Sequence, residues 1–229
     1  MKLLLKIWFP LVAAIVVSYY WIDRPLCDFV FYHSWPQDLS CLNSDTIFHG
    51  GLMQRLFNLK DFIAGWPPLM TSLAPFIFFA AFLFKPGKLR STLLLMSLSI
   101  MLVFLFKNDL KWVFSRYWPL TWVNNNISWV TNHAYGFQWF QGAFFQASDD
   151  TGSFPSGHSA IAFATFLPIG LIYRSTLWYC ISLAVLECIA MIVFDFHFLS
   201  DVFAGVLVGI TSVLAVKSVL VSRDPSPVS

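Results

Sequence analysis

Two residues near the C-terminal end of this sequence have a spacing that suits nucleophilic chemistry. His197 and Asp201 are four residues apart. On a helix they would share one face, and the carboxylate could accept a hydrogen bond from one ring nitrogen. The other nitrogen would then be available as a base or a nucleophile. The alternative is a polar hairpin between two apolar segments, which a His–Asp pair alone does not exclude.

A second histidine stands in a sequence that is typical of a helix start, Pro155-Ser156-Gly157-His158. Pro155 ends the preceding chain, Ser156 is a good N-cap, and Gly157 lets a ligand approach the backbone closely. The free N–H groups and the dipole of such a terminus favour an anion. An ordinary capped helix with an interfacial histidine is an interpretation of equal weight.

Positive charge follows an apolar segment at Lys111 and Arg116. Such residues can anchor a membrane helix by snorkelling, or they can hold a phosphate, for which a guanidinium is well shaped. Two histidines, a carboxylate, two cations and a helix start fall on one predicted membrane face. Together they predict a site that handles phosphate.

The elements that position these residues are predicted to lie in a membrane. The chain has 229 residues, of which 58% are hydrophobic and 11% charged, and a mean hydropathy of +0.69. These values exclude a soluble globular protein and a disordered chain. The net charge of +2 and the lack of a basic stripe exclude a nucleic-acid-binding protein. We therefore predict an all-α, polytopic membrane protein with one integral domain over 1–229 and a disordered tail at 222–229.

Six apolar segments have lengths suited to crossing a bilayer. They are Leu3–Ile22, Leu69–Phe84, Thr92–Phe106, Ser156–Tyr173, Leu177–Phe194 and Val202–Val221. Lysine and arginine are concentrated in the short connections, which places both termini in the cytoplasm and the site outside. We expect a bacterial inner membrane with the site on the periplasmic side. The first segment is interpreted as a retained anchor rather than a cleaved signal peptide, because its apolar run is long and ends in interfacial aromatic residues.

The two long outer loops have further features. Apolar residues from Phe48 to Ile63 recur at spacings of three and four, which predicts an amphipathic helix, either lying in the interface or capping the bundle. Cys27 and Cys41 could form a disulfide in an oxidising compartment, although spacing alone does not decide this. The aromatic segment Trp122–Asp150 predicts a lid over the site or, equally, a structural interfacial belt.

The motifs resemble those of the type 2 phosphatidic acid phosphatase superfamily of membrane enzymes. That family carries Lys-x6-Arg-Pro, Pro-Ser-Gly-His and Ser-Arg-x5-His-x3-Asp, in this order. The second motif is intact at 155–158, and the end of the third is intact at His197 and Asp201. The resemblance covers roughly Leu69–Val221, including the arrangement of the apolar segments.

Two positions depart from the family pattern. Counted from Lys111, the arginine of the first motif is replaced by Trp118, and counted back from His197, the arginine of the third is replaced by Met191. The pocket therefore lacks two expected guanidinium groups. Arg116, two residues before Trp118, or Lys107 or a group of the second long loop would have to compensate.

The resemblance implies a covalent mechanism without a metal or other cofactor. His197 would attack phosphorus and form a phosphohistidine, and Asp201 would orient and stabilise it. His158 would protonate the leaving oxygen and then activate water. The phosphate oxygens would be held by Lys111, Arg116, Ser156 and the Gly157 backbone.

We therefore expect hydrolysis of a lipid phosphomonoester or pyrophosphate at the outer membrane face. Phosphatidic acid, phosphatidylglycerol phosphate, a polyprenyl pyrophosphate and a lipid A phosphate all fit. Two alternatives stay open: a lipid phosphotransferase that uses the same histidine, and a non-catalytic lipid-phosphate binder or transporter. Transport would predict polar residues deep in several spans, where Glu187 is the main example. The sequence does not indicate an oligomeric state.

Overall fold

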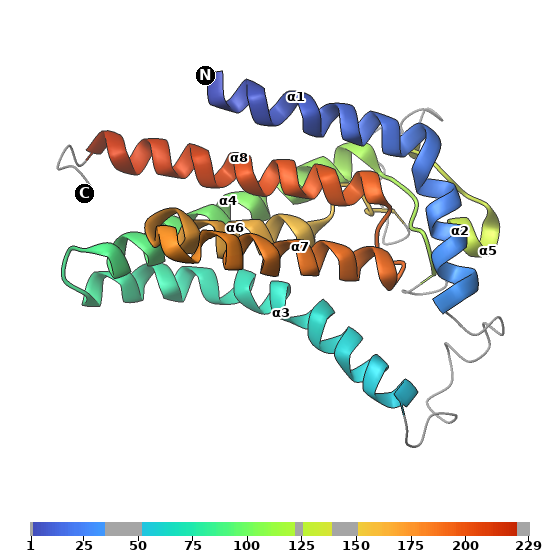
Figure 1. Ribbon diagram of the computed structural model, residues 1–229, viewed down its shortest axis with the longest axis horizontal. Coiled ribbons are helices and arrows are strands. Elements are labelled where there is room, and N and C mark those ends of the chain that lie inside the picture. The colour runs from blue at the N-terminus through green and yellow to red at the C-terminus, as the bar shows by residue number, and fades with distance from the viewer. Residues whose placement is uncertain (1, 35–51, 122–125, 139–150, 224–229) are drawn as a thin grey trace.

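The computed structural model describes residues 2–34, 52–121, 126–138 and 151–223, and these are folded almost entirely as helices (Figure 1). The α-helices are α1 Lys2–Val17, α2 Asp23–Ser34, α3 Leu52–Ala80, α4 Lys88–Phe114, α5 Trp129–Asn132, α6 Gly157–Ile172, α7 Leu177–Val193 and α8 Leu199–Arg223. No strand occurs within these ranges, so the predicted all-α class is confirmed. Cys41 and nearly all of the predicted tail lie outside the described residues.

Five helical stretches are long and apolar enough to cross a membrane, as expected for an integral membrane protein. They are Lys6–His33, Asp61–Leu83, Lys88–Phe114, Arg174–Val193 and Leu199–Leu220. The sixth candidate, α6, is apolar but has only 16 residues, fewer than the roughly 20 that a bilayer crossing needs. The predicted count of six spans is therefore not confirmed.

The first helical arm is longer than its apolar segment predicts. α1 passes through a π-helical turn, Ser18–Ile22, directly into α2. Single π-turns of this kind are frequent at functional sites. The continuous arm extends past the predicted end of the first span, and its second part, α2, lies at the end of the bundle where α8 begins.

α3 joins two elements that were predicted to be separate. The amphipathic segment and the second span form one helix from Leu52 to Ala80, so an independent interfacial helix is not confirmed. Pro67 and Pro68 lie inside this helix, and Figure 1 shows its N-terminal part turned away from the bundle. Proline has no N–H, so each one leaves the carbonyl four residues earlier without its helical partner.

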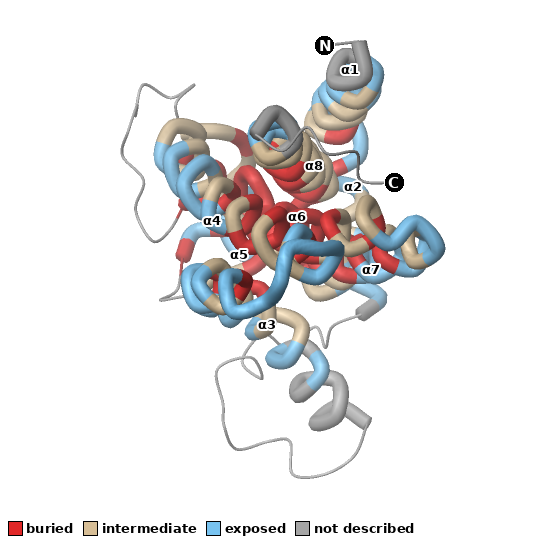
Figure 2. The backbone as a smooth tube through the Cα atoms, turned by 90° about the vertical axis from the view of Figure 1, so that its left-hand side faces the viewer, coloured by how far each residue is buried: buried red, intermediate tan, exposed pale blue. Residues whose placement is uncertain are grey.

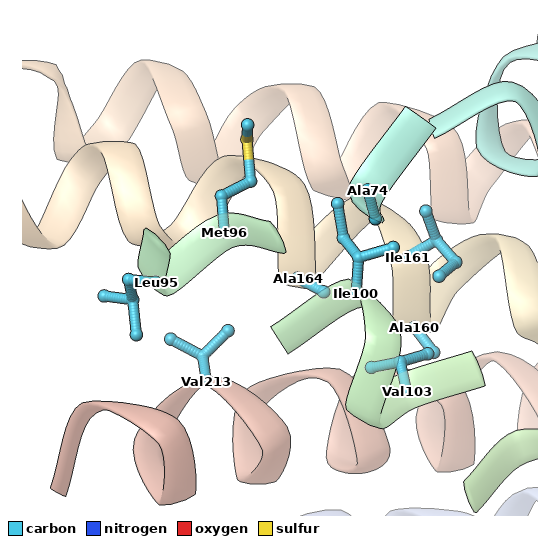
Figure 3. Packing of buried hydrophobic residues seen from close by; sticks show 9 residues of the cluster. All are labelled: Ala74, Leu95, Met96, Ile100, Val103, Ala160, Ile161, Ala164 and Val213. Atoms are coloured by element: carbon cyan, nitrogen blue, oxygen red, sulfur yellow. The ribbon is translucent and has the colours of Figure 1, made fainter. Parts of the chain in front are cut away.

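α6 lies at the centre of the bundle, with α3, α4, α7 and α8 around it (Figure 2). Most of its side chains are buried, which explains why its sequence is apolar on every face. Figure 3 shows one core cluster that α6 shares with α3, α4 and α8. Its members are Ala74, Leu95, Met96, Ile100, Val103, Ala160, Ile161, Ala164 and Val213.

Two glycines allow α8 to pack backbone to backbone against α6. A Cβ atom at Gly205 would lie 2.3 Å from the carbonyl oxygen of Ser156, and one at Gly209 would lie 2.6 Å from that of Ala160. Small residues four apart are a common device for close helix approach in membranes. This contact fixes the first turn of α8 beside the first turn of α6, which is where the predicted site residues lie.

Candidate active site

His197 lies in the turn between α7 and α8. The backbone N–H groups of Phe196 and His197 donate to the Met191 carbonyl at 3.0 and 3.1 Å, and Asp195 has a left-handed φ of 50°. α8 begins only at Leu199, so His197 and Asp201 do not share one helix as the spacing had suggested. The tight turn nevertheless brings the buried imidazole back over the first turn of α8.

The carboxylate of Asp201 holds this turn together. One of its oxygens accepts from the backbone N–H of Phe198 at 3.0 Å, which caps the start of α8, and from the hydroxyl of Ser153. The same oxygen lies 3.8 Å from Nδ1 of His197. That separation exceeds a hydrogen bond, but the two groups are adjacent and buried together.

His158 lies in the first turn of α6, with its ring centre 6.0 Å from that of His197. Its Nε2 is 3.0 Å from the carbonyl oxygen of Ala64 in α3. A carbonyl only accepts, so Nε2 is the protonated nitrogen of the neutral ring, and Nδ1 is left as a base. The Ala64 carbonyl is available because Pro68, four residues on, has no N–H to donate to it.

Two lysines one helical turn apart on α4 lie beside these histidines. Nζ of Lys111 is 5.2 Å from the ring centre of Trp118, and that ring is 5.4 Å from the ring of His197. A Cβ at Gly157 would lie 3.5 Å from Nζ of Lys107. Among the residues that the structure describes, neither ammonium group forms an ion pair. Both charges therefore remain to attract an anion to the start of α6.

The start of α6 is capped and tied to α8. The Ser156 hydroxyl accepts from the backbone N–H of Ser159 at 3.3 Å, as predicted for an N-cap, and also from the Ser159 hydroxyl at 3.1 Å. The Ser156 N–H donates to the Asp201 carbonyl at 2.9 Å. Ser156 is fully buried, so its side chain serves the cap in this structure.

Arg116 is also fully buried, and its guanidinium is bonded to carboxylates. It donates to Asp201, to the Ser200 hydroxyl at 2.7 Å, to Asp23 at 2.7 Å and to the Tyr135 hydroxyl at 3.1 Å. Burial alone would lower the pKa of Arg116, but Asp201 and Asp23 outweigh it and hold this pKa above its ordinary value. The guanidinium of Arg116 thus binds carboxylates of the site, Asp201 and Asp23.

The two positions where arginine was expected have different surroundings. The indole ring of Trp118 lies close to both Lys111 and His197. Met191 is fully buried in a core cluster with residues of α6 and α8, and only its carbonyl serves the site, by holding the turn of His197. The cations nearest the start of α6 are therefore lysines.

The surroundings of His197 favour the neutral form of its imidazole. Burial is the main reason that the pKa of His197 falls below its ordinary value of 6.5, and Lys111 adds to this effect. Asp201 acts in the opposite direction, because a carboxylate favours the protonated ring. A neutral ring retains the lone pair that a nucleophile or base requires.

The described part of the second outer loop packs on the N-terminal arm. Ser128 caps the short helix α5, and the indole N–H of Trp129 donates to Asp28 of α2 at 2.6 Å. The rest of the predicted lid, including Phe140 and Phe144, lies outside the described residues. Deep in the bundle, Trp66 donates to Glu187 at 2.9 Å, so this carboxylate has a partner within the protein.

Fold and site together define a polytopic helical membrane protein with a His–His–Asp cluster beside a lysine-flanked helix start. A family model, the PAP2 superfamily, matches residues 92–224, and the chain belongs to this superfamily. Membership indicates a phosphatase-type function. No curated protein and no solved structure matches the chain. The matched region includes every site residue predicted from the sequence, but it begins after α1, α2 and α3.

Three groups that the structure brings to the site were not among the predicted site residues. Asp23 binds Arg116, Ser153 binds Asp201, and the Ala64 carbonyl binds His158. The sequence carries one faint signal for each. Asp23 directly follows an apolar segment, Ser153 precedes the Pro-Ser-Gly-His motif, and Ala64 stands four residues before the second proline of a Pro-Pro pair.

Proposed function

We propose that this chain is an integral membrane lipid phosphatase that works through a phosphohistidine on His197. The observation that carries the proposal is the arrangement around that ring. It is buried, with Nδ1 beside Asp201, and it lies 6.0 Å from the ring of His158. An anion drawn to the start of α6 by Lys111 and Lys107 would lie near both rings.

In the first half of the reaction, Nε2 of His197 attacks phosphorus and the bond from phosphorus to the lipid oxygen breaks. Nδ1 of His158 takes up a proton when the negatively charged phosphate binds beside it, and the ring gives that proton to the leaving oxygen. In the second half, Nδ1 of His158 takes a proton from water, and the resulting oxygen attacks the phosphohistidine. The phosphorus–nitrogen bond breaks, and inorganic phosphate leaves a neutral His197.

Positive charge develops on the His197 ring as it attacks, and Asp201 is placed to stabilise it. The 3.8 Å separation of Nδ1 and the carboxylate would shorten as substrate binds, because catalytic hydrogen bonds are often long before binding. Lys111, Lys107 and the Gly157 backbone hold the phosphate oxygens. Arg116, in contrast to the expectation from the sequence, contributes by fixing Asp201.

The substrate we propose is a lipid phosphomonoester or pyrophosphate that reaches the site through the bilayer. The site lies at the end of the bundle opposite the start of α1 and the end of α8 (Figure 1). With both of these in the cytoplasm, as the lysine and arginine distribution predicts, the site faces outward, to the periplasm of a bacterial inner membrane.

The test is phosphate release by the purified full chain in detergent, from phosphatidic acid, phosphatidylglycerol phosphate, a polyprenyl pyrophosphate and a lipid A phosphate. His197→Ala should abolish release, and His158→Ala should reduce it about 10²- to 10⁴-fold. His133→Asn is the control, because His133 is exposed and asparagine tolerates its left-handed φ of 53°. A folded wild type that releases no phosphate, or activity that survives His197→Ala, would refute the proposal.

Lysine variants test the phosphate-binding role separately. Lys111→Met should raise KM about 10- to 100-fold, because a hydrogen bond to a charged group contributes about 1.5–3 kcal/mol. Lys88→Met is the matched control, since Lys88 is exposed at the opposite end of the same helix. Equal KM values for the two variants would show that Lys111 does not bind the phosphate. Recovery of a phosphorylated lipid acceptor in place of inorganic phosphate would indicate a phosphotransferase.

A further inference from the structure

The N-terminal arm contributes a buried acid to the active site, although it lies outside the region that matches the family model. Asp23 is 1% exposed and directly follows the π-helical turn. One of its oxygens accepts from Arg116 at 2.7 Å and from the Ser200 hydroxyl, and the other accepts from the Ser200 backbone N–H at 3.0 Å. Asp23 therefore caps the start of α8 from another helix.

We propose that Asp23 is a positioning residue for this active site, which acts on His197 through Arg116 and Asp201. The proposal rests on the function proposed above. Arg116 joins the two carboxylates, with one nitrogen bonded to each. Because Asp201 is held on this side by Arg116 and on the other by Ser153 and the Phe198 N–H, its orientation is fixed before substrate binds.

The guanidinium that transmits this effect is held rigidly. Four aromatic rings lie with their centres between 4.5 and 5.3 Å from Cζ of Arg116. They belong to Tyr19, Tyr135, Phe137 and Phe198. The Tyr135 hydroxyl donates to the Tyr19 carbonyl at 2.5 Å, and its oxygen lies 3.1 Å from the Asp23 carboxylate. Because the guanidinium is enclosed in this way, we expect a change in its bond to Asp23 to alter its bond to Asp201 as well.

The charge of the network also depends on Asp23. Asp23, Arg116 and Asp201 carry −1, +1 and −1, which leaves a net charge of −1 beside His197. Without Asp23, the arginine would neutralise Asp201 and the net charge would be zero. The groups that face the ring from α4 and α6, Lys111 and His158, are cationic or neutral and cannot supply the missing negative charge.

The experiment compares Asp23→Asn with Asp28→Asn in the full chain. Asp28 lies on the same helix and accepts a side-chain hydrogen bond from Trp129, outside this network. Two properties are measured: the kinetics of phosphate release from phosphatidic acid, and the pKa of His197 by NMR of ¹⁵N-labelled histidine. His197→Gln assigns the signal among the five histidines.

For Asp23→Asn we expect kcat to fall about 10- to 100-fold with KM changed less than about 3-fold, as is typical of a lost outer partner. The pKa of His197 should move further down, because a negative charge near the ring has been removed. Asp28→Asn should change neither property. A merely structural defect would admit water and move this pKa up, toward its ordinary value of 6.5.

Two results would overturn the inference. One is an Asp23→Asn variant with an unchanged kcat and an unchanged His197 pKa, and the other is a pKa that rises. If the wild type releases no phosphate from any lipid, the proposed phosphatase function fails. The NMR measurement still decides whether Asp23 controls His197, because it requires no turnover.

Discussion

Gly205→Ala adds one methyl group at the contact between α6 and α8, and we expect it to reduce the proposed phosphatase activity. The new Cβ would lie 2.3 Å from the Ser156 carbonyl oxygen, whereas real Cβ atoms essentially never approach closer than 3.0 Å. α8 must therefore move about 0.7 Å away from α6 at this level, the difference between these two distances. Asp201 lies one turn, about 6 Å, along the same helix and moves with it.

This displacement predicts a loss of activity that exceeds the loss of stability. A misplacement of about 1 Å can reduce the rate about 10²-fold, so we expect kcat/KM to fall between 10- and 100-fold. Overpacking costs about 1–3 kcal/mol of unfolding free energy. Gly209→Ala is the first control, because its Cβ would meet the Ala160 carbonyl oxygen at 2.6 Å and requires a similar but smaller shift, about 12 Å from Asp201.

Gly65→Ala is the second control, since a Cβ at Gly65 meets nothing within 4 Å. The assay pairs phosphate release with thermal unfolding of each purified variant. Gly209→Ala should lose comparable stability but less than about 10-fold in kcat/KM, and Gly65→Ala should retain both properties. If Gly209→Ala loses as much activity as Gly205→Ala, or if Gly205→Ala is fully active, the reasoning from helix position to catalytic geometry is wrong.

Two further predictions concern the histidines. Pro68→Ala restores an N–H that competes with His158 for the Ala64 carbonyl, so kcat should fall roughly 2- to 10-fold while the stability of α3 rises. The control Pro75→Ala, further along the same helix, should keep full activity. Equal kcat values for the two variants would contradict the role of this carbonyl. Because burial lowers the pKa of His197 below 6.5, kcat/KM should hold as the pH falls through 6.5 and decline only at lower pH, which a pH–rate profile checks. The free energy of unfolding should decrease as the pH falls below 6.5, because the unfolded ring takes up a proton more readily than the folded ring. An acidic limb of the pH–rate profile with its midpoint above 6.5 would contradict the first expectation, and a stability that stays constant below pH 6.5 would contradict the second.

The all-helical membrane fold could be predicted because charge is rare and the apolar segments are long. Their ends could not be predicted equally well. α6 ends after 16 residues, since its neighbours enclose it and a full-length lipid-facing surface is not required. α3 continues through Pro67 and Pro68, where local propensity favours a break. In both helices tertiary packing overrides the local signal.

The site could be predicted only as far as its motifs extend. His158, His197 and Asp201 belong to short patterns with a chemical meaning, and the structure brings them together. The partners of Arg116 could not be found in this way. An arginine that holds phosphate and one that holds carboxylates look the same in a sequence, and Asp23 is 93 residues away from Arg116.

The buried ion network is itself an argument for function. Removing the charges of Asp23, Arg116 and Asp201 from water costs several kcal/mol for each ion, and well-packed apolar residues are often as stable or more stable in such places. A membrane-embedded bundle has little need of these charges for its fold, because apolar packing of α6 already holds it together. The network is explained if its benefit lies in the reaction, where a fixed Asp201 and a net negative charge stabilise the cation that forms on His197.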